Sequence, residues 1–536
     1  MRFPKWSIIK KRVPTLIKEY LKFLALVWMA SLLSIFEYWA TNLGQIRPAV
    51  VIRPVLVILL VTLGLFCVFL VILRNLPKAT LLMLLFIGLF FSYGHLINLL
   101  AAKNLLSGKF TSIHILLIYI VISFIGAFFC LRIKKIPANL FTFFQFVVAF
   151  IFIFNIIHII LFDPRISAIM KAPEIVVNDS LTPDNNKPDV YYIVLDAYAR
   201  EDVLQQLYGF DNSDFLDELR ARGFYIPDCA WSNYDRTYDT IPSVLNANYL
   251  NKLGIPNSAL IDLSESQIDL ILNNQVRKSF SSLGYQFVAT RGYGSFNDIL
   301  DADIYLNYFN SQGRKDELGE RFFVYLFLET TLIRANSEFA LEGASNLSTN
   351  GAVSQDQVID KTSLGYEESE FWYNQTNYVF DSLAELPEKT GNYFVYAHIN
   401  SPHGPYVFNR DGSFRFEPDL ADESEYYIDT IIYINQRILN LIDEIQKKSD
   451  TPPIIILQSD HGTHYYDTGI NKHKILSAYY LPGNIDLQPY ATITPVNNFR
   501  LILHDYFDPS IQLLPDTLYV MGENGYQAEP ASCDLQ

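Results

Sequence analysis

Acidic residues are nearly absent from the first third of this 536-residue chain, and charge is scarce throughout it. Only 18% of all residues are charged and 50% are hydrophobic, which excludes a fully disordered chain. Residues 1–165 hold 3 acidic against 17 basic residues, a balance of +14, whereas residues 166–536 hold 53 against 24, a balance of −29. Such a split excludes a purely soluble enzyme. It also excludes a nucleic-acid binder, because the basic part is apolar and the remainder is acidic.

Cysteine is also rare, with four in the whole chain. Cys67 and Cys130 lie in apolar segments, where they are expected to pack as small hydrophobic residues. Cys229 and Cys533 lie in the acidic part, where one disulfide or two free thiols are both compatible with the sequence. No cysteine spacing suits a zinc ribbon, and no internal repeat is present.

Long apolar stretches fill the basic part of the chain. Each is about 20 residues long, the length that a helix needs to cross a bilayer, and the first is too long to be a cleaved signal peptide. His95, His114, Asn155 and His158 are scattered within them without a deeply placed carboxylate, which favours packing or lipid contact over a transport path. The five stretches cover residues 21–43, 50–73, 79–100, 111–131 and 139–162.

Basic residues are distributed unevenly among the connections between these stretches. The N-terminal tail holds seven lysine and arginine residues, the second and fourth connections together hold five, and the first and third together hold four, with the ends of the adjoining stretches included. This bias predicts a multi-pass protein of the cytoplasmic (inner) membrane with a cytoplasmic N-terminus, and five crossings then place the acidic part outside. The expected division is a membrane domain over 1–165, a linker over 166–186 and an exoplasmic, periplasmic-type domain over 187–536.

Short apolar runs alternate with helical patterns in the acidic part. The runs at 190–195, 285–290, 393–398 and 454–458 are typical of buried strands, and 423–448 has the apolar spacing of one helix face. Strands that alternate with helices predict an α/β domain with a mostly parallel sheet covered by helices on both faces. The apolar segment 322–333 is too short to span; a core helix is favoured over an interfacial one.

Polar side chains follow three of these predicted strands. The first strand ends at Asp196, the third runs through His398 toward His403, and the last ends at Asp460 and His461. Because sites form beyond the carboxyl ends of parallel strands, we expect these residues to converge. Asp196, Asp460 and His461 offer two carboxylates and an imidazole, a donor set that suits Zn²⁺ or Mn²⁺.

A nucleophile for such a site is expected in segment 232–246. Pro242 suits the first turn of a helix, so the residues just before it would lie beside free backbone N–H groups that attract phosphate or sulfate. A hydroxyl of Thr237 or Thr240, held by a metal ion, would be activated for attack on phosphorus or sulfur. The alternative is that either threonine merely caps the helix.

Several motifs occur in a characteristic order: VLDAY, NYxxT followed by PSxLN, PHGPYVF, QSDHG, ILSAYYLPG and ITPVNNFRL. Over about residues 187–510 the chain resembles the sulfatase-like branch of the alkaline phosphatase superfamily. Five N-terminal spans before an outside catalytic domain are similar to the lipoteichoic acid synthases and phosphoethanolamine transferases. The resemblance implies an alkaline-phosphatase-like fold.

The resemblance also assigns roles to residues. Asp196, Asp460, His461 and Thr237 match metal ligands, and Thr237 matches the threonine that takes the phosphoryl group. The register of the formylglycine sulfatases would select Thr240 instead. Thr240 is the alternative nucleophile, but it is not a cysteine and Val244 stands where their arginine would be, so that chemistry is disfavoured.

Other residues are candidates for substrate or second-metal contacts. His403 matches a histidine that touches substrate or a second metal, and His473 and His464 are candidates for completing a second site. One or two divalent ions are expected, with Zn²⁺ or Mn²⁺ favoured over Mg²⁺ or Ca²⁺. Anion-binding candidates are Arg236, Arg291 and Lys472.

Together these features predict a membrane-anchored, metal-dependent phosphoryl transferase or esterase that uses a threonine nucleophile. Its expected partner is a membrane lipid or lipid-linked envelope glycan, and nothing in the residues indicates an oligomeric state. The alternatives are a hydrolase of sulfuric or phosphoric esters and a catalytically inactive envelope scaffold or receptor.

Overall fold

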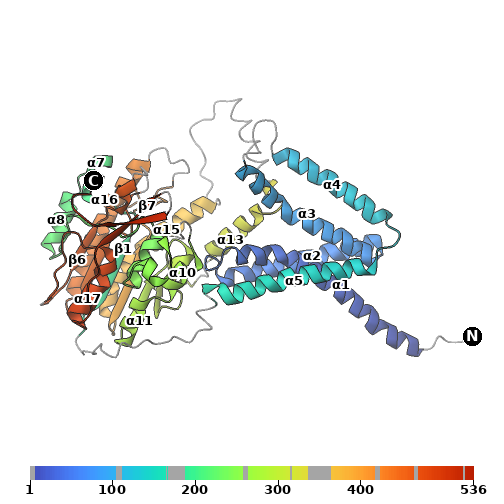
Figure 1. Cartoon of the computed structure of the whole chain (residues 1–536), viewed down its shortest axis with the longest axis horizontal. Helices are drawn as coiled ribbons and strands as arrows, with labels where there is room; N and C mark the ends of the chain where they lie inside the picture. Colours follow the sequence, from blue (N-terminus) through green and yellow to red (C-terminus); the bar gives the residue numbers. More distant parts are fainter. Residues whose placement is uncertain are drawn as a thin grey trace, which may run out of the picture. The chain divides into compact units, whose positions relative to one another are not determined.

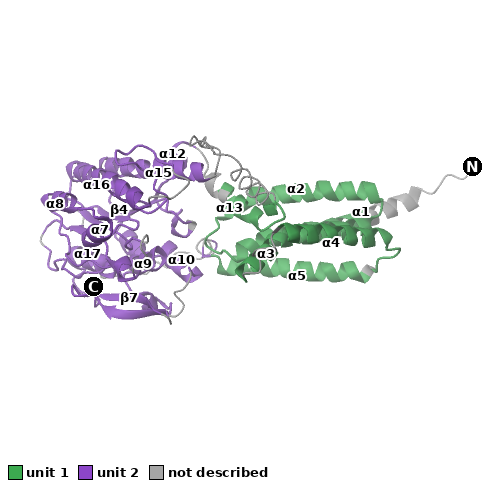
Figure 2. Ribbon diagram, turned by 90° about the horizontal axis from the view of Figure 1, so that it is seen from above, with its two compact units in different colours: residues 1–163, 317–359 green, residues 164–316, 360–536 purple. Residues whose placement is uncertain are grey.

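The computed structural model divides the chain into two compact units, which we describe separately. Unit 1 comprises Met1–Asp163 and Glu317–Ile359, and unit 2 comprises Pro164–Asp316 and Asp360–Gln536 (Figure 2). The described residues are 6–103, 112–164, 166, 187–257, 263–313, 317–335, 364–416, 423–463, 469–483, 485–522 and 525–535.

Unit 1 contains the helices formed by the apolar stretches. Five of them are long and apolar enough to cross a membrane, as the sequence predicted. α1 packs against α2, α3 and α5, and α3 packs against α4. The helices are α1 (Trp6–Ala40), α2 (Pro48–Leu73), α3 (Leu76–Ala102), α4 (Ser112–Arg132), α5 (Ala138–Phe162) and α13 (Glu317–Glu329). Residues 317–335, which the sequence pattern assigns to the exoplasmic domain, belong to unit 1 by their contacts.

Unit 2 is built on a six-stranded sheet in the order β3-β2-β4-β1-β5-β6. All neighbouring strands are parallel except β6, which pairs antiparallel with β5. The predicted mostly parallel sheet is therefore confirmed. The strands are β1 (Val190–Leu195), β2 (Gln286–Thr290), β3 (Ile304–Leu306), β4 (Tyr393–Ile399), β5 (Ile454–Gln458) and β6 (Ser477–Tyr480).

Helices cover both faces of this sheet (Figure 1). Alternate residues of β1 enter two cores, with Tyr191 and Ile193 in one and Tyr192 and Val194 in the other. On the first face lie α7 (Glu201–Tyr208), α8 (Ser213–Ala221), α15 (Leu364–Glu385) and α16 (Glu423–Lys448). On the second lie α9 (Thr237–Leu245), α10 (Glu265–Leu272), α11 (Gln275–Ser282) and α17 (Asn498–Tyr506). A short helix, α12 (Tyr308–Ser311), follows β3.

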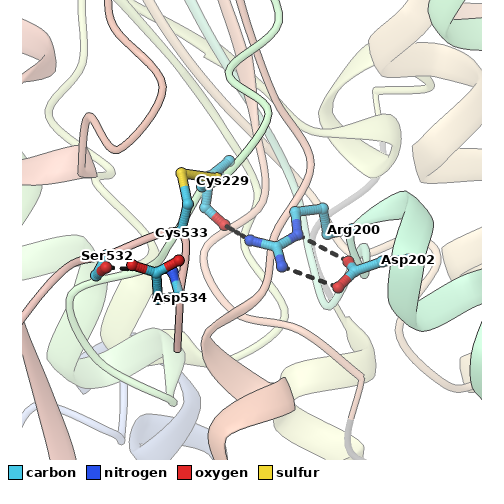
Figure 3. The surroundings of a disulfide bond; sticks show 7 residues. Arg200, Asp202, Cys229, Ser532, Cys533 and Asp534 are labelled. Carbon is cyan, nitrogen blue, oxygen red and sulfur yellow. Dashed lines mark hydrogen bonds and ion pairs between the residues drawn. A yellow bond between two sulfur atoms is a disulfide. The ribbon is translucent and has the colours of Figure 1, made fainter. Parts of the chain in front are cut away.

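A two-stranded hairpin of β7 (Thr517–Gly522) and β8 (Gly525–Pro530) completes unit 2. Just beyond it, Cys533 forms a disulfide with Cys229, with the Cα atoms 5.3 Å apart and 304 positions between them in sequence (Figure 3). Beside the bond, Arg200 donates to the carbonyl of Ala230 at 3.1 Å and pairs with Asp202 at 2.7 Å. The structure thus decides between the two alternatives that the sequence left open for these cysteines.

Asp189 lies immediately before β1, and its buried carboxyl makes the free energy of unfolding depend on pH. Its Oδ1 accepts a hydrogen bond from the backbone N–H of Tyr393 at 2.8 Å, and burial raises the pKa of this carboxyl to about 6. Since the folded pKa exceeds the unfolded one, the native state holds a proton that the unfolded chain has lost. The free energy of unfolding therefore falls as pH rises through this interval.

Asp189→Asn keeps the acceptor and removes the ionisation. We expect it to raise the free energy of unfolding by about 1–2 kcal/mol at neutral pH and by much less near about pH 4. The measurement is thermal unfolding of the purified full chain, followed by tryptophan fluorescence at both pH values. An equal gain at both would contradict the assignment.

Candidate functional site

The carboxyl ends of three adjacent strands bring polar side chains together in unit 2. Asp196 follows β1, His398 lies near the end of β4, and Asp460 follows β5. His398 Nε2 lies 3.4 Å from Asp196 Oδ2 and 4.0 Å from Asp460 Oδ2. All three side chains are buried, and their geometry would allow them to hold one metal ion. The convergence follows from the parallel β4-β1-β5 order, because all three strands end at the same edge.

Three atoms of this cluster have no hydrogen-bond partner although they are buried: Asp196 Oδ1, His398 Nε2 and Asp460 Oδ2. A buried polar atom without a partner is costly, and for a carboxylate the cost is larger still. A bound cation would supply the missing partner for both carboxylates and accept the imidazole nitrogen. The donor set of two oxygens and one nitrogen therefore fits a divalent metal ion.

His461 and Thr237 complete the cluster. His461 Nε2 lies 3.4 Å from Asp196 Oδ1 and 3.6 Å from Asp460 Oδ2. Thr237 Oγ1 lies 3.2 Å from the same nitrogen of His461, whose Nδ1 faces the carbonyl of Gly462 at 2.8 Å. The structure thus brings together Asp196, Asp460, His461 and Thr237, the four residues proposed from sequence as metal ligands.

His398 was not identified as a ligand from the sequence, although its strand was. The only signal was its place at the end of a buried strand, shared by many residues with no such role. Its Nδ1 contacts Asn297 and the hydroxyl of Tyr396, the latter at 3.2 Å, which orients the ring. Asn297 lies far from His398 in sequence, so this support could not be inferred from a motif.

Neighbouring charged groups raise the pKa of His398 and lower the pKa of Asp196. Burial by itself lowers the pKa of His398, but the carboxylates of Asp196 and Asp460 outweigh burial and raise it. Burial by itself raises the pKa of Asp196, but the facing His403 and His398 outweigh it and lower the pKa. The carboxylate of Asp196 is therefore kept ionised, as a metal ligand must be.

The two candidate nucleophiles differ in their surroundings. Thr237 is the first residue of α9 and its hydroxyl faces the cluster. The side chain of Thr240 is fully buried, and its hydroxyl donates to the carbonyl of Tyr234 at 3.2 Å. The geometry therefore favours Thr237 as the group that could attack a substrate.

The expectation that Pro242 lies in the first turn of a helix was wrong, because α9 begins five residues earlier, at Thr237. A proline inside a helix leaves the carbonyl four residues before it without a donor, here that of Tyr238. Gln267 Nε2 donates to this carbonyl at 3.0 Å and to Asp239 Oδ1 at 2.6 Å. Gln267 thus replaces the missing backbone donor, and Thr237 lies at the positive end of the helix.

The three remaining histidine candidates have different outcomes. The rings of His403 and His461 lie 6.4 Å apart, so His403 borders the cluster. His473 ends a short 3-10 helix (Gly469–His473), contacts the carbonyl of Ser232 through Nδ1 at 3.1 Å, and has a pKa lowered by burial. His464 lies outside the described residues.

Two of the anion-binding candidates are paired with carboxylates of the protein. Arg291 lies 2.5 Å from Asp298, and Arg236 lies 3.2 Å from Asp239. The carbonyl of Lys472, the third, accepts from the backbone N–H of Gly462 at 2.6 Å. Tyr526 of β8, which the sequence did not single out, contacts Arg236 and donates to Asp239 Oδ2 at 3.0 Å. The C-terminal hairpin thereby supports the start of α9.

Comparisons with known proteins complete this description. The sulfatase family model matches residues 188–495. No curated protein matches the chain. Among solved structures, the chain is similar to the C-terminal periplasmic domain of EcEptC from Escherichia coli in complex with Zn. The sequence identity is 12% and the TM-score is 0.38, over 65% of this chain and 96% of that one.

Two further structures are similar over comparable lengths. The lipoteichoic acid synthase LtaP from Listeria monocytogenes has 12% identity and a TM-score of 0.36, over 66% of this chain and 90% of that one. The soluble domain of lipooligosaccharide phosphoethanolamine transferase A from Neisseria meningitidis has 11% identity and a TM-score of 0.33, over 60% of this chain and 89% of that one. The family-model match covers more than half of the chain, and the chain therefore belongs to the sulfatase family, with an enzyme domain preceded by five candidate membrane spans.

Proposed function

We propose that this protein is a membrane-anchored, metal-dependent transferase or esterase that acts on phosphoesters of cell-envelope lipid or glycan outside the cytoplasmic membrane. The observation that carries the proposal is the position of the Thr237 hydroxyl, 3.2 Å from His461 and beside two carboxylates with partnerless buried oxygens. The proposed arrangement is a cytoplasmic N-terminus, a membrane domain over 1–165, a linker over 166–186 and an exoplasmic catalytic domain over 187–536, from which residues 317–335 depart to pack with the membrane helices.

Asp196, Asp460, His461 and Thr237 would hold the metal ion. His398 is a fifth potential ligand, because it lies beside Asp196 and Asp460. Zn²⁺ or Mn²⁺ suits this mixture of oxygen and nitrogen better than Mg²⁺ or Ca²⁺ does. When bound, such an ion lowers the pKa of a coordinated hydroxyl and neutralises charge on a phosphoryl group. A second ion near His403 and His473 is part of the same proposal.

The chain itself would position the substrate and the nucleophile. Thr237 opens α9, so backbone N–H groups of the first turn and the helix dipole favour an anionic phosphoryl group there. Thr237 Oγ1 forms a bond to phosphorus as the bond to the leaving oxygen breaks, and the hydroxyl proton ends on the departing alcohol. His403, which borders the cluster, is placed to contact the bound group. A water molecule or an envelope hydroxyl then takes the phosphoryl group from Thr237.

The site favours phosphate over sulfate chemistry of the formylglycine type. Both positions that could hold the nucleophile are threonine, and neither can be converted to formylglycine. The remaining choice is between transferase and hydrolase, which share the first half of the reaction.

Mass spectrometry of the purified full chain, after incubation with membrane lipids, tests this proposal. We expect a covalent adduct on Thr237, whose mass identifies the donor as a phosphoethanolamine or a phosphoglycerol compound. An adduct on Thr240 would show that the wrong threonine has been assigned. No adduct in metal-loaded protein, together with no turnover of phosphoesters, would favour the inactive scaffold.

A further inference from the structure

Residues 317–335 lie between β3 and β4 in sequence, yet they belong to unit 1 with the membrane helices (Figure 2). α13 covers Glu317–Glu329, and a turn over residues 330–333 leads to Arg334 and Ala335, which are helical. We call residues 317–335 the inserted segment. The question is what environment suits a segment that leaves the catalytic fold to pack on transmembrane helices.

One side of α13 packs on the spans through aromatic rings. Tyr38 of α1 lies 5.8 Å from Phe323 and 6.2 Å from Phe327, measured between ring centroids. Phe327 also lies 6.0 Å from Phe91 of α3. Phe323 and Phe327 are four positions apart and therefore share one face of the helix. This face is buried against α1 and α3.

Backbone contacts show how closely the inserted segment approaches α3. The N–H of Gly94 donates to the carbonyl of Thr330 at 3.2 Å, and the N–H of Leu332 donates to the carbonyl of Phe90 at 2.8 Å. A Cβ atom on Gly94 would lie 2.3 Å from the carbonyl oxygen of Glu329 and 2.4 Å from the carbonyl carbon of Thr330. Only glycine permits this contact, since backbone atoms cannot move aside as a flexible side chain can.

The contact lies well inside the span. Gly94 is eight residues before the end of α3 at Ala102, a distance of about 12 Å along the helix. Ala335 joins a buried cluster with Tyr93 and Ile97 of α3 and Ile115 of α4. The inserted segment is therefore held among the spans and does not merely rest on their ends.

The other side of the inserted segment is apolar and exposed. Tyr325 is 50% exposed, Leu326 37% and Ile333 46%, and residues 322–328 contain no charged side chain. The neighbouring spans also expose large apolar side chains, including Ile52 of α2 and Leu99 of α3. Exposed apolar surface of this kind on a span is the surface that faces lipid. The exposed side of the inserted segment has the same apolar character.

We propose that residues 317–335 form a re-entrant element that sits in the membrane, in the leaflet where α1 ends and α2 begins, with Tyr325, Leu326 and Ile333 in contact with lipid. Acidic and basic groups lie around this apolar side, as at an interfacial helix. Glu320 pairs with Arg53 at 3.3 Å, and Arg334 contacts Asn98. The catalytic part of the chain would then be attached to the bilayer at a second place besides the linker. This proposal does not depend on the reaction proposed above.

Fluorescence quenching in the full chain, reconstituted in phosphatidylethanolamine–phosphatidylglycerol vesicles, tests the proposal without an activity readout. In a background with Cys67→Ser and Cys130→Ser, the variants Tyr325→Cys and Ile333→Cys would carry an environment-sensitive label. Leu56→Cys on α2 is the lipid-facing control, and Tyr225→Cys, exposed in unit 2, is the aqueous control. We expect quenching by nitroxide-bearing lipid at 325 and 333 to reach at least about half of that at 56, and iodide to quench only 225.

Iodide quenching at 325 and 333 equal to that at 225 would overturn the proposal, because the segment would then lie in water. Protection from both quenchers would overturn it too, because another protein surface would then cover the segment. Gly94→Leu should release the turn and increase iodide quenching at 333. Gly88→Leu on the same helix is the matched control, since no atom lies within 4 Å of a Cβ there. Unchanged quenching in Gly94→Leu would contradict the docking contact.

Discussion

Thr237→Ala is expected to lower turnover of phosphoesters by about 10³-fold or more, because it would remove the hydroxyl that we propose forms the covalent intermediate. The side chain lies at the start of α9 and its Oγ1 contacts His461 at 3.2 Å, so its loss leaves no other described hydroxyl in that position. The measurement is steady-state turnover with a chromogenic phosphodiester and with membrane lipid, together with the search for a covalent adduct.

Thr237→Ser is the matched control for this change. It retains the hydroxyl and should recover part of the turnover, which a purely structural role of the threonine methyl group would not explain. Thr240→Ala should retain the adduct, because the hydroxyl of Thr240 is buried against the carbonyl of Tyr234. Wild-type turnover in Thr237→Ala would show that another group attacks the substrate.

Asp460→Asn is expected to remove bound metal and, with it, turnover. Asp460 is fully buried and its Oδ2 has no hydrogen-bond partner, while its Oδ1 accepts from the backbone N–H of Ala197 at 3.3 Å. An asparagine can keep the second contact but loses the charge that a cation needs. We expect metal affinity to fall by more than about 10²-fold, since even residues outside the ligand shell contribute up to that much.

Metal content of the dialysed full chain, measured by elemental mass spectrometry, checks this expectation. Wild-type protein should retain one or two divalent ions per chain, and Asp460→Asn should retain fewer, with turnover lost in parallel. Asp443→Asn is the control, because Asp443 is exposed and pairs with Arg222 at 2.7 Å on the surface. Wild-type protein that binds neither zinc nor manganese would contradict the metal-dependent mechanism.

Residues outside the motifs hold the site in place, so its geometry is not evident from the motifs alone. The hydroxyl of Tyr526 in β8 contacts the segment that carries Thr237, and the disulfide of Cys229 with Cys533 ties the chain end to the loop before that segment. Gln267 supplies the donor that Pro242 lacks. Each support lies outside the motif that it holds in place, and none has a distinctive local sequence.

Prediction from sequence succeeded where a pattern is local. The five spans, β1, β5 and α16 were located from run length and periodicity, because burial on one or both faces dictates which positions are apolar. It was less successful for β3 and β6, which are three and four residues long and were not identified. The start of α9 was misplaced because Pro242 was assigned to the first turn of the helix. In the structure Pro242 lies inside the helix, and Gln267 donates to the carbonyl of Tyr238 that the proline leaves without a backbone donor.

What the sequence by itself determined was the division into spans and an α/β domain, and the residue types of the proposed metal-dependent phosphoester site. These follow from local hydrophobicity and from motifs of a few residues. Only the tertiary structure decided that Thr237 and not Thr240 contacts His461, that His398 joins the two carboxylates, that Cys229 pairs with Cys533, and that residues 317–335 pack on the spans. Each of these depends on residues far apart in sequence, and such contacts are set by the packing of whole elements.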